Sequence, residues 1–206
     1  MDLPRKYLSY SAFSLWKSSK DSFRKRYYLN EEIFDTQQSR FGKEQHERME
    51  ASPDVKGSET KIECTIDGIP LLGYVDSLCP DTLKIIDFKF SHLSKTGKEP
   101  WDNVKVRKHQ QFPFYCLIVK GMFDRYNGEV ELHWHETTFK DNTVEFDGHI
   151  LTSDRRGDMD VTGRVEIFKR MVEEYELENI KNEIIKVTNE ISNDYTLWKS
   201  TNNTQN

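Results

Sequence analysis

Three short stretches in the first half of the chain alternate between apolar and polar residues, with the period of two that is typical of β-strands. They cover residues 61–66, 69–76 and 83–90. Asp67-Gly68, between the first two stretches, is typical of a tight hairpin turn. The pattern therefore predicts a meander of three neighbouring strands.

The third stretch carries two charged residues among apolar ones. Asp87 and Lys89 are two residues apart, so both side chains project from the same face of the strand. The opposite face is apolar and is expected to enter a core; it comprises Ile86, Phe88 and Phe90.

A turn signal separates the second and third stretches. The sequence Cys79-Pro80-Asp81 favours a reversal of the chain, which would bring Asp76 close to Asp87. Two carboxylates and an ammonium group on one face are costly unless a ligand or a reaction uses them. A hard divalent cation bound by carboxylate oxygens would use them.

The remaining elements follow from apolar residues at helical spacing, from capping residues and from further alternation. Helices are predicted at residues 9–16, 21–29, 36–50, 104–120 and 163–191. Strands are predicted at residues 129–136 and 144–151, and an irregular loop at 91–103. Pro113 either kinks the fourth helix or lies in its first turn. We expect one α/β domain over residues 1–198, followed by a disordered tail at 199–206.

Composition places the chain among globular proteins. Its 206 residues suffice for one core, and 35% of them are hydrophobic and 32% charged. No run approaches the roughly 18 apolar residues that cross a bilayer, so we expect no membrane association. The cysteines are scattered and odd in number, which favours reduced thiols in a cytoplasmic protein; they are Cys64, Cys79 and Cys116.

Charge is unevenly distributed although the net charge is only −5. Residues 1–26 carry seven basic residues against two acidic ones, and residues 84–108 carry seven against three. Residues 166–191 carry seven acidic residues against four basic ones. A basic cleft on an acidic body fits a phosphate-backbone substrate, and ordinary surface variation is the alternative.

Basic residues lie beside aromatic ones in the second predicted helix. Arg24, Arg26 and Tyr27 are candidate contacts to a nucleic-acid strand, or else form a solvated face over a packed one. Lys105 and Arg107, in the second basic stretch, are further candidates for DNA contact.

Histidines give two other candidate sites. His46 lies four residues after Gly42, whose position inside a helix suggests the close approach of another backbone. As a lone residue, His46 is more typical of a surface or a core position than of a metal ligand. His133 and His135 share one strand face and could bind a metal, but we expect a solvated face there.

Four short motifs occur in a fixed order along the chain. They are Gly42-Lys43-Glu44-Gln45-His46, Gly73-Tyr74-Val75-Asp76, Ile86-Asp87-Phe88-Lys89 and Gln111-Phe112-Pro113-Phe114-Tyr115. This set resembles the GxxxH, GxxD, DxK and QxxxY motifs of the RecB-like branch of the PD-(D/E)XK nuclease superfamily. That branch includes RecB-type exonucleases associated with CRISPR systems and many phage exonucleases. The resemblance covers roughly residues 8–120.

The resemblance implies a restriction-endonuclease-like α/β core, in which helices flank a central mixed sheet. It also implies a metal site. Asp76 and Asp87 would bind Mg²⁺ or Mn²⁺, the Phe88 carbonyl is a further candidate ligand, and His46 would complete the coordination.

The other motif residues would act on the substrate. Lys89 would orient or help to deprotonate the attacking water and stabilise charge on the phosphorane, while Gln111 and Tyr115 would position the substrate or Lys89. Some relatives hold an iron–sulfur cluster through one N-terminal and three C-terminal cysteines. Because no cysteine lies in the N-terminal helices or after Cys116, we expect no such cluster here.

The sequence therefore predicts a metal-dependent deoxyribonuclease, and most specifically an exonuclease on DNA ends or single strands in recombination, repair or phage DNA processing. A recombinase, an annealing protein or a helicase would be its partner by analogy. One alternative is a catalytically silent module that binds DNA ends or a protein partner. Another is a structural protein in which the same carboxylates form surface ion pairs.

Overall fold

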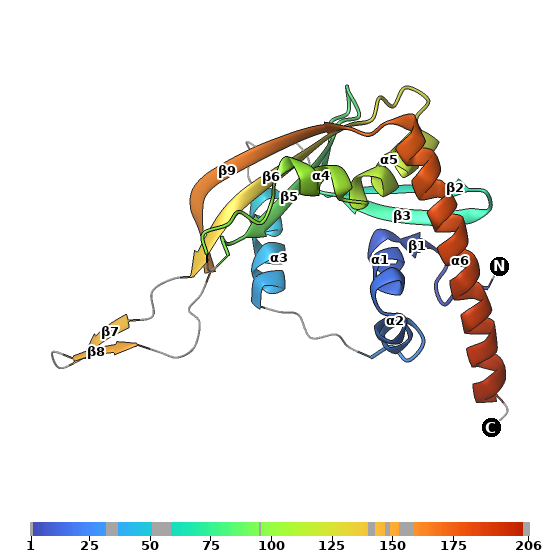
Figure 1. Ribbon diagram of the computed structural model, residues 1–206, viewed down its shortest axis with the longest axis horizontal. Coiled ribbons are helices and arrows are strands. Elements are labelled where there is room, and N and C mark those ends of the chain that lie inside the picture. Colours follow the sequence, from blue (N-terminus) through green and yellow to red (C-terminus); the bar gives the residue numbers. More distant parts are fainter. Residues whose placement is uncertain are drawn as a thin grey trace.

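The computed structural model describes residues 2–31, 37–50, 59–94, 96–139, 143–146, 149–152 and 159–203 (Figure 1). Its helices are α1 (Tyr10–Ser18), α2 (Lys20–Tyr27), α3 (Gln37–Glu50), α4 (Asn103–Lys108), α5 (Gln111–Met122) and α6 (Glu174–Asn203). Its strands are β1 (Leu8–Ser9), β2 (Thr60–Ile66), β3 (Ile69–Val75), β4 (Ser77–Leu78), β5 (Ile85–Ser91), β6 (Glu129–Phe139), β7 (Thr143–Phe146), β8 (His149–Thr152) and β9 (Met159–Met171).

The strands form two mixed sheets and a separate hairpin. In the first sheet the order is β1-β3-β2, with β1 parallel and β2 antiparallel to the central β3. In the second sheet the order is β4-β5-β6-β9, and only β5 and β6 are parallel. α4 and α5 connect these two parallel strands, as a crossover between parallel strands requires. The expected α/β class with helices flanking mixed sheets is confirmed.

The predicted three-strand meander is divided between the two sheets. β2 and β3 pair along their whole length, from Thr60 opposite Val75 to Ile66 opposite Ile69. The chain then passes through Asp76 into β4, which pairs with β5 in the second sheet. The joint between the sheets therefore falls at one of the two carboxylates in the predicted site.

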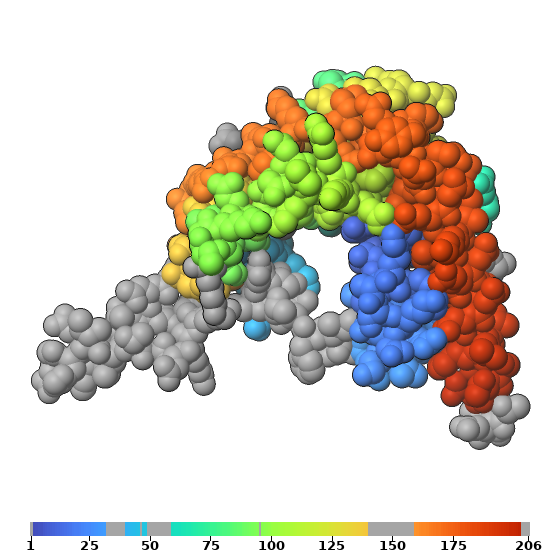
Figure 2. Space-filling view, viewed as in Figure 1, coloured from blue at the N-terminus to red at the C-terminus, as the bar shows by residue number. Residues whose placement is uncertain are grey.

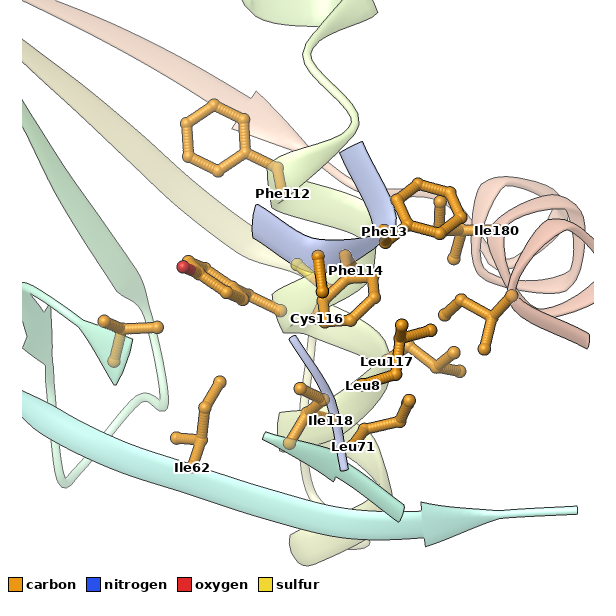
Figure 3. Packing of buried hydrophobic residues seen from close by; sticks show 14 of the residues in the cluster. Leu8, Phe13, Ile62, Leu71, Phe112, Phe114, Cys116, Leu117, Ile118 and Ile180 are labelled. Atoms are coloured by element: carbon orange, nitrogen blue, oxygen red, sulfur yellow. The ribbon is translucent and has the colours of Figure 1, made fainter. Parts of the chain in front are cut away.

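α5 forms the centre of the main core. Every residue from Phe112 to Val119 is buried. Figure 3 shows how these side chains meet Ile62 and Leu71 from the first sheet, Phe13 from α1 and Ile180 from α6. Pro113 is the third residue of α5 and therefore lies in its first turn, where a missing N–H costs no helical hydrogen bond. The predicted helix at 104–120 is thus two helices separated at His109.

The first two helices begin at serine caps. The Ser9 hydroxyl accepts a hydrogen bond from the Ala12 N–H, and the Ser19 hydroxyl accepts one from the Ser22 N–H. The residue before the Ser9 cap, Leu8, is buried and belongs with Ser9 to β1. Ser9 therefore fixes both the start of the helix and its position against the first sheet. The sequence also predicts that Asp35 or Thr36 caps α3, and both lie outside the described residues.

α6 runs along α1 and α2 at one side of the molecule (Figures 1 and 2). Its acidic residues pair with basic residues of the two N-terminal helices. Lys17 Nζ lies 2.5 Å from Glu183 Oε2, and Lys20 Nζ lies 3.1 Å from Glu190 Oε2. The Glu190 carboxylate also accepts a hydrogen bond of 3.0 Å from the Trp16 indole N–H. Much of the N-terminal basic excess is therefore used to hold α6.

The prediction of a helix at 163–191 is wrong over its first part. Residues 159–171 form β9, which pairs antiparallel with β6 in a register that sets Leu132 opposite Phe168. The spacing of Val165 and Phe168 fits a helix, but the free side of β6 offers backbone partners that outweigh this local pattern. The helix begins only where the Glu173 N–H donates to the Glu176 carboxylate.

Two other predicted segments also differ. α6 continues to Asn203, so it extends into the segment that we expected to be a disordered tail. The predicted strand at 144–151 is a pair of antiparallel strands, β7 and β8, and its centre at 147–148 lies outside the described residues. The described part of the chain contains no helix with both the length and the apolar character to cross a bilayer.

Candidate active site

The site lies where β3 passes into β4. Ser77 pairs with Ile86, which places the preceding Asp76 beside the middle of β5. The Asp76 Oδ2 accepts a hydrogen bond of 2.6 Å from the Phe88 backbone N–H. A charged acceptor on a backbone donor makes a strong hydrogen bond, so this contact fixes the Asp76 carboxylate at the joint between the two sheets. The β4–β5 hairpin thus brings Asp76 close to Asp87, as the turn signal predicts.

Asp87 and Lys89 project together from β5, as the alternation predicts. The Lys89 Nζ lies 3.1 Å from Asp87 Oδ1 and 2.9 Å from Oδ2. Asp87 is only 3% exposed, which makes it one of the few buried charged residues of the described chain. A carboxylate at such depth requires a compensating cation, and Lys89 supplies one.

The start of α5 completes this cluster. Gln111 Oε1 lies 3.3 Å from the Lys89 Nζ, and Gln111 Nε2 donates a hydrogen bond of 3.1 Å to the Tyr115 hydroxyl. Gln111 and Tyr115 lie four residues apart, so they share one face of the helix. The two residues of the fourth motif are thereby linked to the lysine of the third.

Gly73 allows the Tyr115 ring to approach the first sheet. A Cβ at this position would lie only 2.9 Å from Cε1 of Tyr115 and 3.2 Å from Ile62. No side chain fits there without displacing the ring, which explains why the second motif carries a glycine three residues before Asp76. Gly42 differs, because a Cβ there would meet no heavy atom within 4 Å among the described residues. The close approach of another backbone that we expected at Gly42 is therefore not found in the described part of the chain.

The electrostatics of the cluster follow from burial and from the two carboxylates. Burial by itself would lower the pKa of Lys89, but the charge and the hydrogen bond of Asp87, together with the charge of Asp76, raise that pKa above its usual value. Burial raises the pKa of the Tyr115 hydroxyl. Burial and then the charge of Lys89 lower the pKa of His109 to about 4, so this imidazole is neutral near pH 7.

These residues open onto a cleft of about 420 Å³. Figure 2 shows the opening beside α1 and α2, under the arch that α4 and α5 form. Besides Asp76, Asp87, Lys89, Gln111 and Tyr115, the cleft is lined by Arg5, Tyr7, Ser9, Tyr10, Ser11, Arg26, Tyr27, Glu59, Leu72, Gly73 and Tyr74. The structure therefore brings all five predicted catalytic residues to one place.

The predicted nucleic-acid contacts are divided by the fold. Arg26 and Tyr27 line the cleft. Arg24 instead holds α6 through two hydrogen bonds to Asp194, of 3.0 Å from Nε and 2.6 Å from Nη2. Lys105 and Arg107 lie on α4 outside the cleft lining, and the Lys105 ammonium donates to the Pro100 carbonyl. A role of these three residues in DNA contact stays a prediction.

Sequence reasoning missed several residues of the lining. Arg5, Tyr7 and Tyr10 reach the cleft because the short strand β1 places the N-terminal segment beside β3. A strand of two residues has no detectable period, so no pattern marks this segment in the sequence. The guanidinium of Arg5 lies 4.8 Å from the centre of the Tyr27 ring, and that of Arg26 lies 5.6 Å from it. We call these three residues the Arg5–Tyr27–Arg26 cluster. It places two guanidiniums at the cleft, both over a buried tyrosine ring.

The donor atoms suit a hard divalent cation. Asp76 and Asp87 present carboxylate oxygens to one cleft, which are the ligands that Mg²⁺ and Mn²⁺ prefer. Among the side chains that the structure describes, no three His, Cys, Asp or Glu residues form a metal-binding group. The His46 side chain, the third side-chain ligand that the family resemblance implies, lies outside the described side chains. The residues present therefore fit a metal held by two carboxylates, and the parts of His46 and the Phe88 carbonyl stay predictions.

The histidines of β6 belong to another surface. His133 lies opposite Phe88 in the sheet register, and the rings form an edge contact with centroids 5.5 Å apart. The His133 Nε2 lies 2.9 Å from the buried Glu131 carboxylate, which also contacts Lys84 at 3.0 Å. Burial by itself would raise the pKa of Glu131, but hydrogen bonds from these two residues lower it to about 2. The His133 side chain is 18% exposed, so the expected solvated face is instead a half-buried network on β6, the strand next to β5.

Comparison with known proteins identifies the fold. No family model and no curated protein matches the chain. A solved structure from Eubacterium rectale, named "Putative exonuclease", aligns over 92% of this chain and 82% of its own, with 12% identity and a TM-score of 0.57. The alkaline exonuclease LHK-Exo from Laribacter hongkongensis aligns over 98% and 95%, with 13% identity and a TM-score of 0.52. LHK-Exo in complex with dAMP gives a TM-score of 0.50. The chain thus has a mixed α/β fold similar to that of exonuclease structures.

Proposed function

We propose that this protein is a metal-dependent deoxyribonuclease that acts as an exonuclease on DNA ends or single strands. The observation that carries the proposal is the cluster of Asp76, Asp87 and Lys89 at the joint of the two sheets, on a fold similar to exonuclease structures. A purely structural ion pair does not need a second carboxylate or an open cleft beside it. The pairing of this cluster with a cleft favours hydrolysis of a phosphodiester bond.

The proposed roles follow from the contacts of each residue. Asp76 and Asp87 would hold the cation, which when bound supplies Lewis acidity towards the phosphodiester and its attacking water. Lys89 has its ammonium between Asp87 and Gln111, so it can orient the attacking water and stabilise negative charge on the phosphorus centre. Gln111 and Tyr115 position Lys89 through their linked hydrogen bonds.

The cleft also supports the choice of nucleic acid as the substrate. Arg5 and Arg26 supply positive charge on a protein whose net charge is −5, and both guanidiniums lie over the ring of the buried Tyr27. Arginine beside aromatic side chains is the usual chemistry for holding a nucleic-acid strand. We therefore add Arg5 to Arg26 and Tyr27 as a candidate backbone contact.

Cleavage of end-labelled DNA tests the proposal. Single-stranded and blunt double-stranded oligonucleotides, each labelled at the 5′ or the 3′ end, are incubated with the protein and Mn²⁺ or Mg²⁺, and products are resolved by length. We expect stepwise shortening from an end with either metal and none in EDTA. Asp76→Asn, Asp87→Asn and Lys89→Met are expected to abolish it.

A matched control uses Asp81, an exposed carboxylate on the same hairpin outside the cleft. Asp81→Asn is expected to cleave like wild type. If wild type degrades none of the substrates with either metal, the proposal of an active nuclease is wrong. If Asp87→Asn cleaves at the wild-type rate, catalysis does not depend on this cluster.

A further inference from the structure

One aromatic side chain in the cleft, Tyr74, has no part in the proposed chemistry. Tyr74 lies on β3, in which the neighbouring residues Gly73 and Val75 are buried, yet the tyrosine itself is 47% exposed. It lines the same cleft as Asp76, which follows it by two residues at the bend after β3. A large aromatic ring is thus presented to the substrate beside a proposed metal ligand.

The backbone that carries Tyr74 is held firmly. β3 is the central strand of its sheet. β2 pairs with it along its whole length and sets Lys61 directly opposite Tyr74, whereas the pairing with β1 ends at Leu72. The preceding residue, Gly73, lies against the Tyr115 ring and Ile62. A ring on such a strand loses little freedom when it contacts a ligand, because the backbone is already ordered and tyrosine has only two side-chain torsions.

The charge and the size of the cleft indicate which kind of ligand the Tyr74 ring can contact. The Arg5–Tyr27–Arg26 cluster in the same cleft provides cations for phosphates, and a cleft of about 420 Å³ has room for a ligand of the size of a nucleotide. Every base has a π-face, so stacking on a tyrosine holds any base, provided that the base has left its own stack. A base inside a duplex is stacked on both of its faces and has no free face to offer.

We propose that Tyr74 stacks on the base of the nucleotide next to the scissile phosphodiester, so that the site takes unpaired nucleotides at this position. This inference rests on the proposed nuclease function, which it deepens by naming the recognised group. Discrimination arises from the presence of a base and its unpaired state, and not from base identity. Tyr74 is therefore a specificity-determining residue, separate from the residues proposed to hold the metal.

Binding measured in EDTA tests the stacking whether or not cleavage occurs. Single-stranded oligonucleotides carry 2-aminopurine at one of the three terminal positions, and its fluorescence is followed on titration with protein. We expect quenching at one position by wild type and by Tyr74→Phe, which keeps the aromatic ring. Tyr74→Leu keeps apolar bulk without the ring and is expected to leave the fluorescence unquenched. Equal quenching by Tyr74→Leu would overturn the proposal.

Cleavage kinetics on abasic substrates give the second measurement. Removing the base at the quenched position is expected to raise the wild-type KM by roughly tenfold, with little change in kcat. Tyr74→Leu is expected to show the same rise on the base-bearing substrate and no further rise on the abasic one. Tyr175→Ala, which removes an exposed tyrosine outside the cleft, serves as the control. A Tyr74→Leu effect that is equal on both substrates would contradict stacking, whereas a wild type that quenches without cleaving would contradict only the nuclease function.

Discussion

The substitution Lys89→Met tests how much the Lys89 ammonium stabilises the buried Asp87 carboxylate at the proposed metal site. The substitution removes the ammonium that lies 2.9 Å from the Asp87 carboxylate but keeps the length of the side chain. Removal of one partner of a fully buried pair costs about 3–5 kcal/mol, because the other charge stays buried without compensation. The Lys89 side chain is 28% exposed, so water offsets part of this cost, and we expect a loss of about 2 kcal/mol.

The loss is measured as a change in melting temperature. For a chain of this length, 1 kcal/mol corresponds to roughly 2–4 °C, so Lys89→Met is expected to melt about 4–8 °C below wild type in EDTA. Added Mn²⁺ is expected to raise the melting temperature of the variant more than that of wild type. In wild type the cation competes with the ammonium for Asp87, whereas in the variant this competition is absent.

A double variant separates this account from simple loss of packing. In Asp87→Asn/Lys89→Met both charges are absent, so the melting temperature in EDTA is expected to lie above that of Lys89→Met, and the Mn²⁺ shift is expected to disappear. The reasoning is refuted if Lys89→Met melts like wild type in EDTA. It is refuted equally if Mn²⁺ stabilises the double variant as much as the single one.

Other substitutions test individual features of the fold. Gly73→Ala places a Cβ 2.9 Å from an aromatic carbon of Tyr115 on α5, and it is expected to lower the free energy of unfolding by about 1–3 kcal/mol in urea titrations. At Gly42, in the middle of α3, a Cβ would meet no described atom within 4 Å, so Gly42→Ala is expected to raise the free energy of unfolding by up to ~1 kcal/mol. Arg24→Ala and Asp194→Ala are expected to show a coupling energy of about 1 kcal/mol in a double-mutant cycle, a small value because both side chains are partly exposed. Additive losses of stability would contradict an ion pair that holds α6 to α2. Glu131→Gln is expected to flatten the acid limb of the stability curve. The folded-state pKa of about 2 lies below the ordinary value of 4.5, so the carboxylate stabilises wild type above about pH 4.5 and loses that effect as pH falls towards 2.

The arrangement of the candidate site could be predicted because most of its residues lie on regular elements with a strict period. The alternation along β5 places Asp87 and Lys89 on one face, and helical spacing places Gln111 and Tyr115 on another. The turn signal at Cys79-Pro80 corresponds to a real reversal, in which the Leu83 N–H donates to the Cys79 carbonyl. Short-range geometry of this kind follows from the residue order alone.

The parts that could not be predicted depend on contacts between distant segments. Residues 159–171 become a strand because β6 has an open edge, although the same apolar positions also fit a helix. Arg24 contributes to a basic stretch in the sequence but reaches an acidic residue 170 positions away. Arg5 enters the cleft through the two-residue pairing of β1 with β3. In each case the local sequence is compatible with several outcomes, and tertiary pairing selects one.

Titration of Mn²⁺ into the protein, followed by calorimetry, tests most directly whether Asp76 and Asp87 together form a metal site. The account predicts that wild type and Asp81→Asn bind Mn²⁺ with the same affinity. It also predicts that Asp76→Asn and Asp87→Asn each weaken binding by about tenfold or more, since each removes a charged oxygen ligand. Unchanged Mn²⁺ affinity in both Asp76→Asn and Asp87→Asn would contradict the account.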